Sequence, residues 1–240
     1  RSGKGVTYRH RTTPTGARPG TLNVKFPSRR VLVTGGASGI GRAIVKAFCD
    51  VGCRVAFCDI DSKAGAATAQ ATGAQFHPVD VRDAAALERC MDRLLEAWGD
   101  IDVIVNNVGV SAFKPLEEST LEEWDDIMSI NVRPVYITSR KLAIHRRDMG
   151  GEPHYGRIIN MASTRQSMSE AGTEAYSASK GAVDSLTHAL MMSLAPLGIT
   201  VNSVSPGWIE TGDYDALSEA DHSQHPSRRV GCVDDIARAC

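Results

Sequence analysis

The stretch Val31-Leu32-Val33-Thr34-Gly35-Gly36-Ala37-Ser38-Gly39-Ile40-Gly41-Arg42 decides the fold class. A short apolar run rich in β-branched residues leads through a glycine-rich turn directly into a helical segment, as in a nucleotide-binding βα unit. Gly35 permits the tight turn, Gly39 lets the backbone approach a pyrophosphate, and Gly41 lets the helix pack closely on the sheet. The helix N-terminus would face the anion, so we expect a dinucleotide site here.

Apolar runs and helical segments alternate along the rest of the chain. This pattern predicts a doubly wound parallel α/β sheet, the Rossmann fold, with helices on both faces. The expected strands are 31–33, 54–58, 75–79, 103–106, 157–161 and 200–204. The expected helices are 42–51, 64–71, 84–98, 121–145 and 175–197. Residues 233–240 begin another helix that no strand follows, which suggests that the natural chain continues.

The composition fits a single globular domain. The chain has 240 residues, 42% of them hydrophobic and 23% charged, enough for one core around a closed small-molecule site. A formal net charge of −1 provides no field for a polyanion, so we expect no nucleic-acid partner. No apolar run approaches the ~20 residues that span a bilayer, so we expect no membrane partner.

The cysteines predict buried thiols rather than a metal site. Six are present, none forms a Cys-x-x-Cys pair, and the group Cys49, Cys53 and Cys58 has no His nearby. We expect no metal and a reducing, cytoplasmic environment.

Residues 1–28 differ from the rest of the chain. They are rich in Arg, Lys, Thr, Gly and Pro and poor in apolar side chains, so they bury too little surface to fold alone. We expect a flexible basic N-terminal arm at 1–28 and a dinucleotide-binding and catalytic domain at 29–240.

An acidic residue after the second expected strand indicates which dinucleotide binds. Asp59 ends the run Arg54-Val55-Ala56-Phe57-Cys58-Asp59, about 20 residues beyond the turn. Its carboxylate can accept both ribose hydroxyls of an adenosine and would repel a 2′-phosphate. Ser38 and Ile60 provide no cation for such a phosphate, so we expect NAD to be preferred over NADP. The alternative is a solvated carboxylate in a loop.

Tyr176 and Lys180 are candidate catalytic residues. The segment Glu174-Ala175-Tyr176-Ser177-Ala178-Ser179-Lys180 places them at i and i+4 on one face of an expected helix. A phenol with a pKa of ~10 is a poor base at neutral pH, but a neighbouring ammonium favours its phenolate. The spacing alone also occurs by chance in many helices.

With these motifs together, the chain resembles the main branch of the short-chain dehydrogenase/reductase family. The resemblance rests on four separated motifs: the glycine-rich turn, Asn106-Asn107-Val108-Gly109, Ser163, and Tyr176-x-x-x-Lys180. It runs from about Arg30 to Arg238 and implies a Rossmann fold. Val108 stands where the family most often has Ala, and the family's last strand, after the final helix, is absent.

The resemblance implies a catalytic group of four residues. Ser163 would polarise the substrate oxygen, while Tyr176 would donate or remove its proton. Lys180 would hold the nicotinamide ribose and tune the tyrosine. Asn131, in Ser129-Ile130-Asn131-Val132, would help to anchor a proton-relay water.

The resemblance also implies the remaining cofactor contacts. Asp80 and Val81 correspond to a pair at the adenine. Pro206 and Gly207 would lie under the nicotinamide, and Thr211 would hold its carboxamide. The expected cofactor-binding residues are Gly35, Ser38, Gly39, Ile40, Gly41, Asp59, Asp80, Val81, Asn107, Gly109, Tyr176, Lys180, Pro206, Gly207, Ile209 and Thr211.

These residues predict an enzyme. The expected reaction moves a hydride between NAD and a carbonyl or secondary alcohol. A mostly polar set of candidate substrate residues favours a sugar or other small hydroxylated compound: Val110, Ser111, Thr164, Arg165, Glu174 and Trp208. The alternatives are a 3-oxoacyl thioester reductase and a non-catalytic dinucleotide-binding sensor or scaffold.

Two further expectations concern mobility and assembly. Residues 212–229, rich in Asp, Ser and His, are expected to form a mobile lid over the substrate. The expected helices 121–145 and 175–197 correspond to those that pair across a two-fold axis in the family, so we expect a homodimer or homotetramer. Trp124, Leu186 and Leu190 are candidate contacts, although core packing explains an apolar stripe equally well.

Overall fold

The structure, a computed structural model, describes residues 25–240. The basic arm expected at 1–28 therefore lies mostly outside the described residues. Within the described part, the backbone N–H of Phe26 donates to the carbonyl of Val51 (2.9 Å) and that of Ser28 to Gly52 (3.0 Å). Residues 26–28 thus lie against the turn that precedes the second strand.

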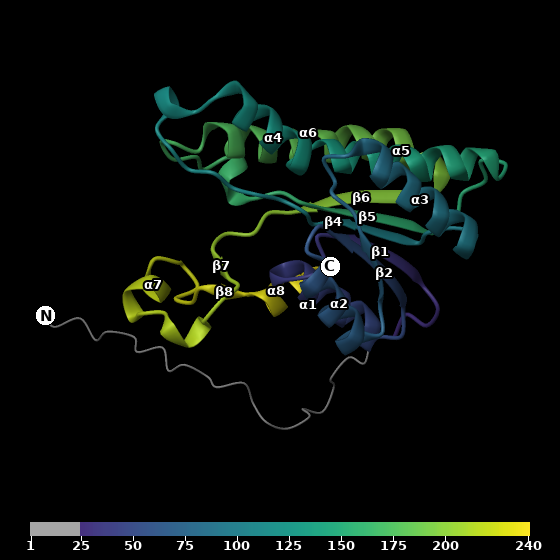
Figure 1. Cartoon of the computed structure of the whole chain (residues 1–240), viewed down its shortest axis with the longest axis horizontal. Coiled ribbons are helices and arrows are strands. Elements are labelled where there is room, and N and C mark those ends of the chain that lie inside the picture. The colour runs from purple at the N-terminus through teal and green to yellow at the C-terminus, as the bar shows by residue number, and fades with distance from the viewer. Residues whose placement is uncertain (1–24) are drawn as a thin grey trace, which may run out of the picture.

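A six-stranded parallel sheet forms the centre of the domain (Figure 1). Its strand order is β3-β2-β1-β4-β5-β6, and the winding direction reverses between β1 and β4, as in a doubly wound Rossmann sheet. The predicted fold class is confirmed. The strands are β1 (Arg30–Thr34), β2 (Arg54–Asp59), β3 (Gln75–Pro78), β4 (Val103–Asn106), β5 (Gly156–Met161) and β6 (Ile199–Val204).

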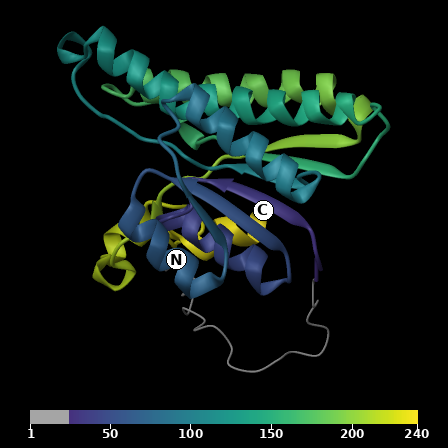
Figure 2. The ribbon, with the colours of Figure 1, turned by 45° about the vertical axis from the view of Figure 1, so that its right-hand side comes forward.

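Helices cover both faces of this sheet (Figures 1 and 2). One face carries α1, α2 and α8, and the other carries α3, α4, α5 and α6, with a separate cluster of buried apolar residues under each layer. The helices are α1 (Gly39–Asp50), α2 (Ser62–Thr72), α3 (Ala84–Trp98), α4 (Leu121–Asn131), α5 (Arg133–Asp148), α6 (Glu174–Leu194), α7 (Glu219–Ser223) and α8 (Val233–Ala239). No helix within residues 25–240 is long and apolar enough to cross a membrane.

The single helix predicted over 121–145 is wrong. The structure has two helices there, α4 and α5, which meet at Val132. Pro134 lies in the first turn of α5, where its missing N–H is tolerated, but the same residue cannot continue α4 because its ring clashes with the preceding turn. The break leaves Asn131 as the last residue of α4, facing the end of the sheet.

A short second sheet joins two segments that sequence patterns did not pair. β7 (Ile209–Glu210) and β8 (Gly231–Cys232) run parallel and enclose the segment 211–230, which contains α7. The hydroxyl of Tyr214 donates to the carbonyl of Val230 (2.6 Å), and Arg229 forms an ion pair with Asp235 on α8 (2.7 Å). These contacts join the two ends of the segment that was expected as a lid and tie its second end to α8.

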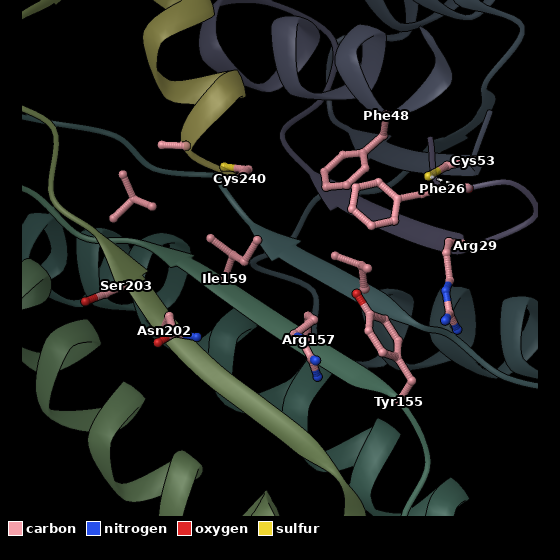
Figure 3. A pocket seen from close by; sticks show the side chains of 13 residues that line it. Phe26, Arg29, Phe48, Cys53, Tyr155, Arg157, Ile159, Asn202, Ser203 and Cys240 are labelled. Carbon is pink, nitrogen blue, oxygen red and sulfur yellow. Dashed lines mark hydrogen bonds between the residues drawn. The ribbon is translucent and has the colours of Figure 1, made fainter. Parts of the chain in front are cut away.

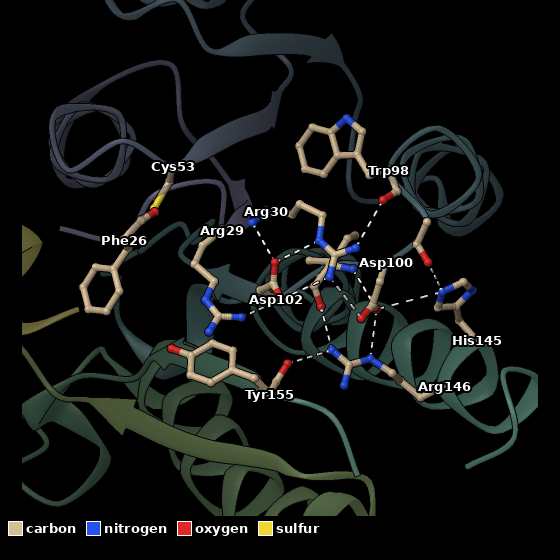
Figure 4. Close-up of polar contacts among 12 residues, drawn as sticks. Phe26, Arg29, Arg30, Cys53, Trp98, Asp100, Asp102, His145, Arg146 and Tyr155 are labelled. Carbon is tan, nitrogen blue, oxygen red and sulfur yellow. Dashed lines mark hydrogen bonds and ion pairs between the residues drawn. The ribbon is translucent and has the colours of Figure 1, made fainter. Parts of the chain in front are cut away.

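Buried ion pairs hold the opposite, amino edge of the sheet (Figure 4). Asp102 accepts from the backbone N–H and the side-chain Nε of Arg30, both at 2.8 Å. Asp100 accepts from Nε of Arg146 (2.8 Å), whose side chain is completely buried and also donates to the carbonyl of Tyr155 (2.9 Å). These contacts join the starts of β1, β4 and β5 to α5.

Candidate active site at the carboxyl edge of the sheet

A cavity of about 210 Å³ opens beyond the carboxyl ends of β4, β5 and β6. It is bordered by loops that follow these strands and by the first turns of α6. The lining residues are Ile40, Asn107, Gly109, Val110, Ser111, Met161, Ala162, Ser163, Tyr176, Lys180, Pro206, Gly207 and Ile209. Three of the four expected catalytic residues thus meet at one cavity, and the fourth, Asn131, lies directly behind its wall.

Tyr176 and Lys180 project from the same side of α6 into this cavity. The Lys180 ammonium lies 5.7 Å from the centre of the Tyr176 ring and donates to the carbonyl of Met161 (2.8 Å). Only 4% of Lys180 is exposed, and this burial lowers the pKa of its ammonium to about 8. The cavity thus holds a buried cationic side chain beside the Tyr176 ring.

Ser163 follows β5 and lies at the start of a short 3₁₀ turn. Its Oγ accepts from the backbone N–H of Arg165 (3.2 Å), while the residue as a whole is 7% exposed and lines the cavity. A hydroxyl that accepts one hydrogen bond still has its proton to donate. Ser163 can therefore donate to a substrate oxygen without giving up its local contact.

Asn131 connects the loop after β4 with α6. Its Oδ1 accepts from the N–H of Val110 (2.8 Å), and its Nδ2 donates to the carbonyl of Val110 and to Oγ of Ser179, both at 2.9 Å. The side chain is 2% exposed. In this structure Asn131 positions the cavity wall.

The glycine-rich turn has the close packing that the sequence predicts. Gly35 has a φ of +69°, in the left-handed region that favours glycine. A side chain at Gly41 would overlap the carbonyl oxygen of Gly35, so the start of α1 packs against the turn only because no Cβ is present. Nδ2 of Asn107 donates to the carbonyls of Thr34 (3.2 Å) and Gly35 (2.9 Å), which ties the turn to the end of β4.

A second cavity of about 240 Å³ lies on the other side of this turn. Val110 lines both cavities, so together they offer an extended site. The second cavity is lined by Gly35, Cys58, Asp59, Ile60, Val79, Asp80, Val81, Arg82, Val108, Val110 and Ile130. These include both acids that were expected at the adenosine half of a dinucleotide.

The two acids in the second cavity have different partners. Asp59 accepts from the backbone N–H groups of Ala37 and Asp61, both at 3.0 Å, so its carboxylate is fixed against the glycine-rich turn. Asp80 accepts from Arg82 (2.7 Å), and this hydrogen bond keeps the pKa of the Asp80 carboxyl below its ordinary value. Sequence reasoning missed Arg82, although a cation two residues beyond a strand-end acid is a visible signal.

The other expected cofactor residues occupy the rim. Pro206, Gly207 and Ile209 line the first cavity. Thr211 lies close to the turn, since a Cβ at Gly39 would be 3.4 Å from its methyl carbon. Ser38 precedes α1, is exposed, and makes no capping hydrogen bond with its side chain.

The expected substrate residues divide into two groups. Val110 and Ser111 line the cavity, whereas the other four lie outside its lining: Thr164, Arg165, Glu174 and Trp208. Arg165 forms an ion pair with Glu170 (2.6 Å), and Glu174 accepts from the backbone N–H of Gly172 (3.3 Å).

An aromatic residue that sequence reasoning missed lies next to the tyrosine. The rings of Phe113 and Tyr176 are 5.9 Å apart and perpendicular, and Phe113 is 63% exposed. The available signal was the one aromatic residue in the loop after β4.

Another cavity, of about 350 Å³, lies between α1, α8 and strands β4 to β6 (Figure 3). Its walls include Phe26, Phe48 and Tyr155. None of the expected catalytic, cofactor or substrate residues lines it, so the chemistry is assigned to the carboxyl edge.

Known proteins resemble this chain in sequence and in fold. The sequence profile described as short chain dehydrogenase matches residues 29–222. An uncharacterized oxidoreductase of Thermotoga maritima is 40% identical, with 87% of this chain and 85% of that protein covered. Sorbitol dehydrogenase of Cereibacter sphaeroides is 36% identical, with 88% and 84% covered. Among solved structures, a short chain dehydrogenase from Burkholderia cenocepacia J2315 in complex with NADP has a TM-score of 0.79, 33% identity, and 89% of each chain covered.

Proposed function

Because the chain belongs to the short-chain dehydrogenase/reductase family, we propose that it is an NAD-dependent oxidoreductase acting on a carbonyl or secondary alcohol. The observation that carries the proposal is the pairing of Tyr176 with the buried Lys180 ammonium at a cavity that Ser163 also lines. A sensor that had lost catalysis would have no need for this arrangement.

The residues present fit a nicotinamide dinucleotide. Side chains at Gly35 and Gly41 would collide with backbone atoms, so only glycine fits these two positions of the turn. The turn leads directly into α1, and the N–H groups at the start of a helix favour a phosphate. Two cavities on either side of this turn match the two halves of such a cofactor. The nicotinamide, when bound, supplies or accepts the hydride.

Asp59 supports a preference for NAD. Its carboxylate is fixed at the second cavity by two backbone N–H groups. In that position it can accept from ribose hydroxyls and would repel a 2′-phosphate. Arg82 lines the same cavity, but its guanidinium is engaged by Asp80 and Asp126.

In this reaction the protein binds the substrate and the cofactor and transfers one proton. Ser163 Oγ donates a hydrogen bond to the substrate oxygen, while the Tyr176 hydroxyl gives that oxygen a proton in reduction or removes it in oxidation. Lys180 would hold the ribose, and its positive charge would attract the negative charge that develops on the Tyr176 oxygen when the proton leaves. Asn131 keeps the loop at Val110 in place and, by the family resemblance, anchors a relay water.

The proposed substrate is a ketone or a secondary alcohol. The expected preference for a sugar rests partly on Arg165 and Glu174. Both of these charged residues make contacts within the protein. The 3-oxoacyl thioester alternative gains no separate support from the site. A panel containing a polyol, a simple ketone and a 3-oxoacyl thioester, assayed with NADH and NADPH, distinguishes these substrates.

The deciding experiment replaces Tyr176 by Phe. The ring that packs is kept and the exchanging hydroxyl is lost, so turnover should fall by about 10²- to 10⁴-fold while the Kd for NADH stays unchanged. Tyr136→Phe removes a hydroxyl from a tyrosine on α5 that is 53% exposed and serves as the matched control. A Tyr176→Phe enzyme with normal turnover would remove the proposed catalytic role.

We also propose a homodimer or homotetramer in the cytoplasm. α4, α5 and α6 form one outer layer, on which Trp124 and Tyr136 are partly exposed, while Leu186 and Leu190 pack against buried residues of their own subunit. All six cysteines are free thiols, which supports a reducing compartment. Light scattering at micromolar concentration tests the assembly.

A further inference from the structure

Phe113 is held in place by its neighbours on both sides. Three residues earlier, Val110 makes two hydrogen bonds with Asn131. The next residue, Lys114, donates its backbone N–H to the carbonyl of Gly172 (3.1 Å) and pairs through Nζ with Glu123 (2.7 Å). The loop therefore presents the Phe113 side chain in a defined position next to the cavity.

The exposure of Phe113 is not explained by packing within the chain. Its ring meets Tyr176 edge to face, and 63% of the residue still lies in water. Exposed apolar surface costs free energy, and several such residues around one cleft mark a surface that binds something apolar. Val110, which lines the cavity three residues before Phe113, is 42% exposed.

Two cationic side chains near this loop are already paired within the protein. Arg165 pairs with Glu170, and Lys114 pairs with Glu123. Recognition of an anionic substituent by Lys114 or Arg165 would have to compete with these pairs. An apolar substituent would instead bury Phe113 without displacing them.

We infer that the substrate carries an aromatic ring on the carbon that is oxidised or reduced, and that Phe113 determines this specificity. The inference rests on the proposed function. A substrate oxygen bound to the Tyr176 hydroxyl lies within about 2.6–3.2 Å of it, so the neighbouring substituent comes close to Phe113. Aromatic rings associate at centre separations of about 4.5–7 Å, which this geometry permits.

The experiment compares acetophenone with 2-butanone as ketone substrates of the full chain with NADH. The wild-type enzyme should favour acetophenone in kcat/KM. Phe113→Ala should lower kcat/KM for acetophenone by about tenfold, the loss expected for one apolar ring contact, and leave 2-butanone within about twofold. Phe113→Tyr should keep the preference. Leu121→Ala, which removes an apolar side chain that is 80% exposed at the start of α4, should change neither substrate.

Two results would overturn the inference: equal wild-type efficiency for both ketones, or an equal loss for both in Phe113→Ala. Ligand-detected NMR measures the binding of acetophenone to the enzyme with NADH. This measurement distinguishes a failure of this inference from a failure of the proposed function. If neither ketone nor any alcohol is turned over, the proposed function fails. Acetophenone binding that is lost in Phe113→Ala but kept in Leu121→Ala would still support the aromatic subsite, and binding that ignores Phe113 would reject it.

Discussion

Binding of NADH should weaken as pH rises above 8, because Lys180 loses its proton there. Burial lowers the pKa of this ammonium to about 8 from an ordinary value of 10.5. About nine-tenths of the enzyme then carries the charged form at pH 7 and about one-tenth at pH 9. If the cofactor ribose binds the charged form, the apparent Kd rises by about tenfold over these two pH units, since it scales inversely with the competent fraction.

Fluorescence titration of NADH at several pH values measures this change directly. Lys180→Met keeps an unbranched side chain of similar length but has no proton to lose, so its Kd should be higher at pH 7 and flat with pH. Lys141→Met, on α5 in an ion pair with Asp92, should keep the wild-type profile. A flat wild-type profile, or a Lys180→Met profile that still rises, would refute the role given to this ammonium.

Two further predictions concern cofactor choice and stability. Asp59→Asn keeps an acceptor for the N–H of Ala37 but removes the charge, so the kcat/KM advantage of NAD over NADP should shrink by about tenfold or more; equal efficiencies in the wild type would contradict the premise. Arg146→Met leaves the buried Asp100 without its closest partner and should cost about 3 kcal/mol of unfolding free energy, or roughly 6–12 °C in Tm. Lys46→Met, in an exposed helical pair, should melt like the wild type, and an Arg146→Met protein that does the same would show that the ion pair adds nothing.

The sequence predicted those parts of the fold that depend on local signals. The helix 84–98 has exactly the predicted bounds, because Asp83 caps its first turn and Gly99 ends it in the left-handed conformation. The strand 103–106 was also predicted without error, since its four residues are all buried between apolar neighbours. The parallel sheet with helices on both faces followed from alternation of the two element types, whereas its strand order was not predicted.

The remaining features depend on contacts between distant residues. β7 and β8 are two residues long and have no periodicity to detect, so only their pairing defines them. The break at Val132 was not predicted because the apolar pattern continues through it. Only Pro134 indicates that one helix ends there and another begins. The residue types of Arg82 and Phe113 are visible in the sequence, but their contacts with Asp80 and Tyr176 appear only in the folded loops after β3 and β4.

The position of α6, and with it the Tyr176 and Lys180 pair, is set by a buried chain of polar side chains. Nδ2 of Asn106 on β4 donates to Oδ1 of Asn160 on β5 (2.8 Å), and Nδ2 of Asn160 donates to Oγ1 of Thr187 on α6 (2.8 Å). Apolar contacts alone would tolerate a helix that slides along the sheet, whereas each of these buried groups loses a partner if α6 shifts. Thr187 lies two turns beyond Lys180 on the same helix. The hydrogen bond from Asn160 to Thr187 therefore also fixes how far the Lys180 ammonium reaches into the cavity. Asn106 therefore stabilises the core, while the next residue, Asn107, holds the glycine-rich turn. The same short motif thus supports both the fold and the candidate site.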